Sequence, residues 1–433
     1  MQEMVHKDQL KGHKAVVVGA GRSGLSAAAL LGSLGAGVQL LEKRTDFDAS
    51  QLESRSLQDV ELILGEHQQE HFRDADLVVV SPGISLAMVK NFCSRDQTVL
   101  SELELASWFI SEPVIAVTGT NGKTTTCMLI QSVLEKAGRR VFTGGNIGTP
   151  LSDHVLSKER ADILVLEVSS FQLQGCSGFA PHVGVLLNFS ANHLDHHESE
   201  EEYFRAKMQL FARQNPLDLA VMPLELRARV ENDFRIKSNI TYFAPTGRFD
   251  CPALPGAHNQ ANMEAAMLAC GFVNVSRKTF DQALQKFTPP SHRQEVFLTQ
   301  GEVTFINDSK ATTLEAMAAA LKAFDAPIRL LAGGRYKGGD FSLLARTIQG
   351  KAAKVYLFGD SREIFENAWK DSVEMEYFPD LEQAAARAVQ ESRPGDNVLL
   401  SPGTASFDLF RDYQARGEAF KEKVKQETGT KVQ

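Results

Sequence analysis

The chain has 433 residues, which suggests about three domains at roughly 150 residues each. Its composition is that of a globular protein, with 43% hydrophobic and 23% charged residues. The net charge of −8, without a basic tract, argues against nucleic-acid binding, and no apolar run approaches the ~20 residues of a membrane span. Five scattered cysteines fit neither a metal site nor a disulfide framework, so we expect a reduced, cytoplasmic protein.

A glycine-rich turn follows the first predicted strand. Residues 15–18 are apolar, and the next segment, Gly19-Ala-Gly-Arg-Ser-Gly24, opens a helix rich in alanine and leucine. Glycines 19, 21 and 24 have the spacing of a dinucleotide fingerprint, which lets a pyrophosphate approach a helix N-terminus. The pattern alone leaves three possibilities open: an NAD site, a site for another diphosphate such as a nucleotide sugar, or a plain strand–turn–helix unit.

Another strand, predicted at residues 75–80, runs into Ser81-Pro-Gly-Ile84. Ligands of doubly wound sheets bind at the carboxyl ends of parallel strands, so this turn belongs to the same predicted binding edge. Residues 111–113, Ser-Glu-Pro, then form a predicted linker to the next domain.

The most informative stretch runs from Val114 to Thr126. It reads as a buried strand, a loop with two glycines, a Lys-Thr pair and a helix. In such a unit the backbone N–H groups face phosphates, the lysine neutralises their charge and the hydroxyl reaches Mg²⁺. The common eight-residue pattern would place its first glycine at Val117, whereas this loop has Gly119. We predict a nucleoside triphosphate site.

Polar residues follow the next predicted strands. The strand at 141–143 leads to Gly144-Gly-Asn-Ile-Gly148, and the strand at 163–166 ends at Glu167. A carboxylate at a strand end beside a phosphate loop is placed to hold Mg²⁺, directly or through water. A segment with three histidines follows the strand at 183–187. A zinc site is disfavoured, because His196 and His197 are adjacent and no further Cys/His cluster completes a tetrahedral site.

The C-terminal segment repeats the alternation of strand and helix after a break at Pro289-Pro290. Strands are predicted at 303–306, 328–332, 355–358 and 397–400, and polar runs follow three of them. We therefore expect an α/β protein of three domains with mostly parallel sheets. The expected domains are residues 1–107, Rossmann-like; 108–290, P-loop NTPase-like; and 291–433, Rossmann-like.

Several of these segments together resemble the Mur ligases, the ATP-dependent amide-forming enzymes of peptidoglycan synthesis. The matching segments are 118–124, 144–148, 167–172, Asn192-His-Leu-Asp195, Tyr203-x-x-Ala-Lys207 and the G-x-H-N-x-x-N run at 256–262. The C-terminal segments 307–312, 333–341, 399–408 and 413–417 resemble the members of the family that add D-glutamate. Spacing alone gives no reason to single out Lys207, because a helical lysine usually lies on a solvated face.

The resemblance implies that ATP drives the joining of D-glutamate to UDP-N-acetylmuramoyl-L-alanine through an acyl phosphate, with two Mg²⁺ ions and a CO₂-derived carbamate on Lys207. It also implies a site within one chain, hence a monomer. The implied catalytic residues are Lys123, Glu167, His193 and Lys207, and the implied metal-binding residues are Thr124, Glu167, His193 and Lys207.

The resemblance further assigns three binding sites. ATP would contact Gly119, Thr120, Asn121, Gly122, Lys123, Thr124, Thr125, Asn259, Asn262, Arg293 and Asp308. The UDP-sugar would contact Gly21, Arg22, Ser23, Arg44, Gly83, Asn146 and Ser169, which makes NAD an unfavoured ligand of the first glycine turn. D-glutamate would contact Lys310, Thr312, Lys337, Ser406 and Phe407.

Two kinds of alternative remain at this point. One is a ligase for a different amino acid or a folylpolyglutamate-type enzyme, which the Ser406-Phe407 segment disfavours. The other is a non-catalytic nucleotide sensor or an NTPase switch, which the joint presence of Glu167, His193 and Lys207 disfavours. Glu42, at the end of the second strand, stands where many relatives have aspartate.

Overall fold

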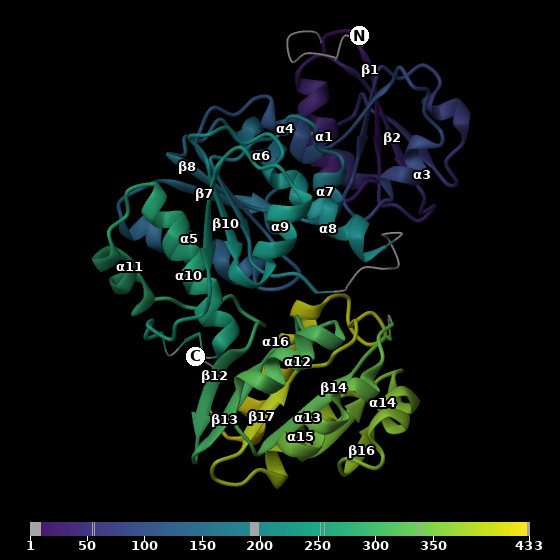
Figure 1. The fold of residues 1–433 in the computed structure, drawn as a ribbon. Coiled ribbons are helices and arrows are strands. Elements are labelled where there is room, and N and C mark those ends of the chain that lie inside the picture. The colour runs from purple at the N-terminus through teal and green to yellow at the C-terminus, as the bar shows by residue number, and fades with distance from the viewer. Residues whose placement is uncertain are drawn as a thin grey trace. The chain divides into compact units, whose positions relative to one another are not determined.

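The computed structural model describes residues 10–53, 55, 57–190, 199–251, 253–254, 256–336 and 338–430. Within these residues the strands form three sheets (Figure 1). The chain divides into two compact units, which we describe separately. The first unit comprises residues 1–246 and 261–284 and holds two of the sheets; the second comprises residues 247–260 and 285–433 and holds the third. The expected α/β class is confirmed, whereas the three domain boundaries stay a prediction.

The N-terminal sheet of the first unit is entirely parallel, in the order β3-β2-β1-β4-β5. Its strands are β1 (Lys14–Val18), β2 (Gly37–Glu42), β3 (Glu61–Leu64), β4 (Leu77–Val80) and β5 (Thr98–Ser101), with helices α1 (Arg22–Ser33), α2 (Ser50–Glu53), α3 (Leu86–Lys90) and α4 (Glu102–Ser107). The strand order reverses at β1, so the glycine turn between β1 and α1 lies at the topological switch point, where doubly wound sheets bind ligands.

The central sheet of the first unit is also parallel, in the order β11-β10-β9-β6-β8-β7. Its strands are β6 (Val114–Thr118), β7 (Val141–Gly145), β8 (Ile163–Glu167), β9 (Val183–Leu186), β10 (Leu219–Pro223) and β11 (Asn239–Phe243). Its helices are α5 (Lys123–Lys136), α6 (Leu151–Ser157), α7 (Ser170–Gln174), α8 (Glu200–Met208), α9 (Arg227–Asp233), α10 (Ala257–Phe272), of which residues from Ala261 onward belong to this unit, and α11 (Arg277–Leu284). Because β6 lies between β8 and β9, the loop after β6 is flanked by the ends of both neighbours.

The sheet of the second unit has the order β12-β13-β17-β14-β15-β16, in which β12 alone is antiparallel to its neighbour. Its strands are β12 (Glu295–Gln300), β13 (Val303–Asn307), β14 (Ile328–Gly333), β15 (Ala352–Phe358), β16 (Met375–Phe378) and β17 (Asn397–Leu400). Its helices are α12 (Leu314–Ala323), α13 (Ala345–Lys351), α14 (Arg362–Trp369), α15 (Leu381–Glu391) and α16 (Tyr413–Glu427). Leu330 and Leu331 of β14 enter different core clusters, so helices cover both faces of the sheet.

Two buried carboxylates join the N-terminal and central parts of the first unit through α4. Glu102 is fully buried and accepts a hydrogen bond from the backbone N–H of Ser152 at 2.7 Å. Glu104 accepts from the N–H groups of Gly178 and Phe179, both at 2.9 Å. In the described part of the chain, Oε2 of Glu102 has no hydrogen-bond partner. Burial therefore raises the pKa of Glu102 to about 7, against the hydrogen bonds from Ser152.

This raised pKa predicts that the unit loses stability as the pH increases. The folded state keeps Glu102 protonated up to about pH 7, whereas the unfolded chain releases that proton near its ordinary pKa of 4.5. The free energy of unfolding should therefore decrease as the pH rises through this window, by at most about 3 kcal/mol. The variant Glu102→Gln should lack that decrease, which thermal unfolding between pH 5 and 8 would measure. Equal pH slopes for the wild type and the variant would contradict the prediction, and the exposed Glu61→Gln is the control.

Candidate active site

The loop between β6 and α5 has the backbone geometry of a phosphate cradle. Helix α5 begins at Lys123, and Gly122 caps it with φ of 84°. Gly119 has φ of 149°, so both glycines adopt a backbone region that other residues rarely occupy. A Cβ atom on Gly122 would lie 2.6 Å from Oδ1 of Asn262, which places this α10 side chain against the loop. The two glycines thus lead β6 directly into the N-terminus of α5, and a helix N-terminus is a favourable place for an anion.

Lys123 lies across this loop. Its Nζ donates hydrogen bonds to the backbone carbonyls of Gly119 and Thr120, both at 2.9 Å. The lysine is the first residue of α5, so its charge sits at the positive end of the helix dipole. The positive charge of Lys123 and the positive end of the α5 dipole repel each other, which is unfavourable unless an anion binds at the N-terminus of α5. The arrangement fits a site for the outer phosphates of a nucleotide.

Glu167 meets two other predicted site residues at the end of β8. Oγ1 of Thr124 donates to its Oε2 at 2.6 Å, and Nδ2 of Asn146 donates to its Oε1 at 3.0 Å. The backbone N–H of Asn146 also donates to the carbonyl of Glu167 at 2.8 Å. Glu167 is 2% exposed, so this carboxylate is held in place on both oxygens. A carboxylate and a hydroxyl beside a phosphate cradle are the hard oxygen ligands that suit Mg²⁺.

Lys207 is a buried lysine beside the same loop. It comes from α8, is 2% exposed and donates from Nζ to the carbonyl of Gly119 at 3.0 Å. The ring of Tyr203, one helical turn earlier, has its centroid 4.4 Å from the same Nζ. Burial, and secondarily the charge of Lys123, lower the pKa of Lys207 well below its ordinary value. This lowering shifts Lys207 toward the neutral amine, which is the nucleophilic form.

Asn188 is a site residue for which the sequence assigned no role. It follows β9, and its Oδ1 accepts from the N–H of Asn121 at 2.9 Å while its Nδ2 donates to the carbonyl of Asn121 at 3.1 Å. The side-chain amide of Asn188 thus bonds both the N–H and the carbonyl of Asn121, as the backbone of a neighbouring strand would. The signal that could have found it is its position at the end of a predicted strand, although the pairing of β9 with β6 was unknown.

Removal of the Asn188 amide should impair nucleotide use. The variant Asn188→Ala loses both hydrogen bonds to Asn121, which frees the phosphate loop to shift relative to α5. We expect kcat/KM for ATP to fall by about 10- to 100-fold, because displacements of about 1 Å at reacting groups have effects of this size. Steady-state kinetics with varied ATP would measure it, and a change below about twofold would contradict the structural role.

The first glycine turn, between β1 and α1, packs tightly on itself and against the turn that follows β4. Any side chain at Gly24 would overlap the carbonyl oxygen of Gly19, and that carbonyl also accepts from Oγ of Ser81 at 2.9 Å. Gly21 is the N-cap of α1, which places Arg22 and Ser23 in the first helical turn. The guanidinium of Arg22 donates to the carbonyl of Gly148 in the central part of the same unit at 2.6 Å.

Glu42 holds this turn in place. Its Oε2 accepts from the N–H of Ala20 at 2.9 Å, and its Oε1 accepts from the N–H and Nε of Arg44 at 3.0 and 3.1 Å. The hydrogen bonds from Arg44 and Ala20 lower the pKa of Glu42, although burial acts in the opposite direction. Gly83, with φ of 94°, lies in the turn after β4, and Ser169 caps α7 through its hydroxyl.

Most of the remaining predicted residues lie on loops of the second unit. Asp308 is buried, accepts from the N–H of Gln294 at 3.1 Å and from Oγ of Ser401 at 2.8 Å, and burial raises its pKa to about 7. Arg293 stands between two residues of positive φ, His292 and Gln294. The loops after β13 and β17 carry Lys310, Thr312, Ser406 and Phe407, and Asn259 lies in α10. His193 and Lys337 lie outside the described residues.

Three family models match the chain in order. They are described as the Mur ligase MurD-like N-terminal domain, at residues 13–96; the Mur ligase middle domain, at residues 117–242; and the Mur ligase glutamate ligase domain, at residues 292–403. A UDP-N-acetylmuramoylalanine–D-glutamate ligase of Oleidesulfovibrio alaskensis is 46% identical over 95% of this chain and 94% of its own length. The ligase of the same name from Nitratidesulfovibrio vulgaris is 47% identical over 95% and 96%. The chain belongs to the Mur ligase family.

Solved structures support the same fold at lower identity. The crystal structure of the MurF ligase of Thermotoga maritima in complex with ADP matches with a TM-score of 0.63 and 19% identity, over 92% of this chain and 96% of that one. The MurF ligase of Acinetobacter baumannii matches with a TM-score of 0.59 and 15% identity, over 98% and 92%. These likenesses concern the fold alone. In the described part of this chain, we find no helix with the length and apolar character of a membrane span.

Proposed function

We propose that this chain is the ATP-dependent ligase that adds D-glutamate to UDP-N-acetylmuramoyl-L-alanine, in cytoplasmic synthesis of peptidoglycan precursors. The observation that carries the proposal is the 46% and 47% identity, over 95% of the chain, to two ligases with that printed name. The phosphate cradle at Lys123 and the carboxylate at Glu167 supply the chemistry that an ATP-dependent ligase needs.

The reaction has two steps. The carboxylate of the L-alanine residue attacks the γ-phosphorus of ATP, which gives an acyl phosphate and releases ADP. The amine of D-glutamate then attacks the acyl carbonyl, and the tetrahedral intermediate loses a proton and expels inorganic phosphate. Both steps depend on orientation and on neutralisation of phosphate charge, so no serine or cysteine nucleophile is required.

The proposed catalytic roles are those that the family resemblance assigns, and the contacts around the loop support the roles of Lys123, Glu167 and Lys207. Lys123 would bind the outer phosphates, and Thr124, Glu167, His193 and modified Lys207 would hold the two Mg²⁺ ions. Bound Mg²⁺ supplies charge neutralisation at the phosphates. Asn146 orients Glu167 through its amide, as the 3.0 Å hydrogen bond indicates.

The proposal includes a covalent modification of Lys207. A neutral amine can attack CO₂ and lose a proton, which converts the lysine into a carbamate with a negative charge. The buried position of Nζ and its lowered pKa support this reaction. The carbamate would then supply an oxygen ligand for the second Mg²⁺.

The other assignments rest on the resemblance together with the placements described above. We propose a UDP-sugar site at the first glycine turn, an ATP site completed by Asn259, Asn262, Arg293 and Asp308, and a D-glutamate site on the loops of the second unit. We retain residues 1–107, 108–290 and 291–433 as the three functional domains, and a monomer as the active form.

A release assay tests the proposed function. The release of inorganic phosphate is measured in the presence of ATP, UDP-N-acetylmuramoyl-L-alanine and one amino acid at a time, from a panel that includes L and D forms. We expect release that requires the UDP-sugar and is strongest with D-glutamate, with a ligated product of the corresponding mass. Preference for another amino acid would point to a different ligase, and hydrolysis of ATP without either substrate would point to an NTPase switch.

A further inference from the structure

Arg416 is a fully buried arginine in the first turn of α16. Its guanidinium donates to four oxygen atoms, all of them neutral. These are Oγ of Ser309 at 3.0 Å, the carbonyl of Ser309 at 2.8 Å, the carbonyl of Thr404 at 3.1 Å and the carbonyl of Gly333 at 3.3 Å. One side chain thus contacts three segments that are far apart in the sequence.

Those segments are the end of β14 with the loop that follows it, and the loops that follow β13 and β17, at the carboxyl edge of the sheet. They are packed closely, because a Cβ atom on Gly334 would lie 2.9 Å from Nη1 of Arg416 and would overlap the carbonyl of Ala405. Arg335 and Ala405 also exchange two backbone hydrogen bonds, at 2.8 and 3.0 Å. Helix α16 adds a further tie, since Oγ of Ser309 donates to the carbonyl of Tyr413 at 2.8 Å. The three loops therefore share one anchor.

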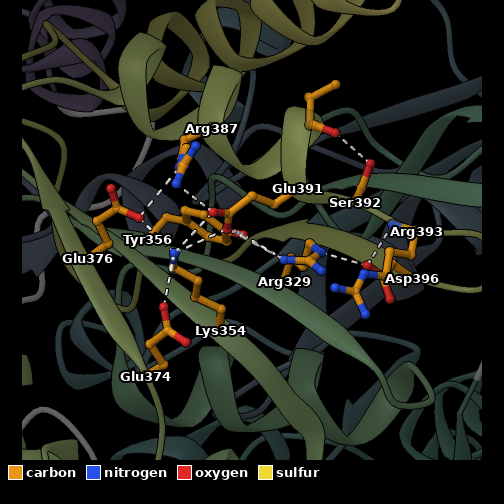
Figure 2. Close-up of polar contacts among 11 residues, drawn as sticks. Arg329, Lys354, Tyr356, Glu374, Glu376, Arg387, Glu391, Ser392, Arg393 and Asp396 are labelled. Atoms are coloured by element: carbon orange, nitrogen blue, oxygen red, sulfur yellow. Dashed lines mark hydrogen bonds and ion pairs between the residues drawn. The ribbon is translucent and has the colours of Figure 1, made fainter.

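The guanidinium of Arg416 has different partners from that of Arg329, a buried arginine in strand β14 of the same unit. Arg329 lies at the opposite edge, where its Nε is 2.5 Å from Asp396 and its Nη1 is 3.7 Å from Glu391, in a network that includes Lys354 and Tyr356 (Figure 2). Within the described residues, no carboxylate forms an ion pair with Arg416. Burial lowers the pKa of Arg416 to about 10, against the attraction of Asp408 and Asp308.

We propose that Arg416 is a positioning residue for the acceptor amino acid, and that its charge, which forms no ion pair with a carboxylate of the described residues, favours an acceptor with two carboxylates. The proposal rests on the proposed function, because the loops it anchors carry Lys310, Thr312, Ser406 and Phe407. The reacting form of D-glutamate has a neutral amine and two carboxylates, so it is a dianion. A buried cation beneath the loops attracts that form more than it attracts an acceptor with one carboxylate.

The test compares two substitutions of Arg416 with matched changes of Arg329. Arg416→Gln removes the charge, and Arg416→Lys keeps the charge but offers a single nitrogen to the three loops. We expect both to raise KM for D-glutamate by about tenfold or more, with the larger rise in Arg416→Gln, because each loses hydrogen bonds from a charged donor. KM for ATP, and formation of the acyl phosphate without D-glutamate, should change by clearly less than KM for D-glutamate does.

The controls separate this role from a general loss of structure. Arg329→Gln and Arg329→Lys should lower the unfolding temperature and leave KM for D-glutamate within about twofold. Ser309→Ala, a smaller change in the same anchor, should reproduce the rise in KM for D-glutamate to a lesser degree, even if Arg416→Gln does not fold. An unchanged KM for D-glutamate in Arg416→Lys and Ser309→Ala, or an equal rise in both values of KM, would overturn the inference. A wild-type protein that does not use D-glutamate would overturn the proposed function instead.

Discussion

Replacement of Lys207 by alanine is expected to reduce kcat by about 100- to 1,000-fold, the effect of losing one electrostatic stabiliser of a transition state. The lysine is buried against the phosphate loop, with its Nζ on the carbonyl of Gly119. In the proposed mechanism, a carbamate on Lys207 would be the anion that helps to hold the second Mg²⁺. Alanine removes that anion and leaves the cavity that it occupied.

The cavity left in Lys207→Ala allows a rescue experiment. A short carboxylic acid such as acetate or propionate should enter it and restore part of the activity of Lys207→Ala in a concentration-dependent way. The matched control is Arg205→Ala, in the same helix, since the Arg205 side chain is 63% exposed and pairs only with Glu201 among the described residues. Full activity in Lys207→Ala would reject the carbamate, and an inactive variant that no acid restores would reject its role as a replaceable anion.

Substitution of Lys123 by alanine should have an effect at least as large, about 1,000-fold on formation of the acyl phosphate. The lysine stands at the N-terminus of α5 and lies across the loop through two hydrogen bonds. Its loss removes the positive charge that would face the phosphoryl group as it is transferred. Trapping of the acyl phosphate without D-glutamate measures this step alone.

The control for Lys123 comes from the other end of the same helix. Lys136 is in the last turn of α5 and is exposed, so Lys136→Ala should retain wild-type rates. Binding of the UDP-sugar to Lys123→Ala should also be retained, because its proposed site is at the first glycine turn. Retained ATP-dependent ligation in Lys123→Ala would refute the assignment of the phosphate loop.

The sequence predicted most of the strands that are buried on both faces, although it missed the interior strand β10, and it missed most of those at the sheet edges. The predicted β1, β6, β8, β14 and β17 are continuous apolar runs in the middle of their sheets. The missed strands β3, β11, β12 and β16 are edge strands with mixed burial, so their polar residues hide the pattern. The alternation of strands and helices was nevertheless sufficient for the fold class.

The parts of the site that lie in one continuous segment could be predicted from the sequence. The parts that depend on contacts between distant segments could not. The phosphate loop is local, so its glycines, Lys123 and Thr124 followed from their spacing. Asn188 and Arg416 act through pairings of distant loops, which no spacing reports. Lys207 required the family resemblance, because a buried lysine and a solvated one look the same in a helical pattern.

Transfer of an oxygen label tests the central claim, that ATP activates the substrate carboxylate as an acyl phosphate. UDP-N-acetylmuramoyl-L-alanine with ¹⁸O in both carboxylate oxygens is ligated to D-glutamate, and the inorganic phosphate is analysed by mass. An acyl phosphate intermediate should place one ¹⁸O atom in each phosphate, because a carboxylate oxygen leaves with the phosphoryl group. Phosphate without the label, formed together with the ligated product, would contradict it.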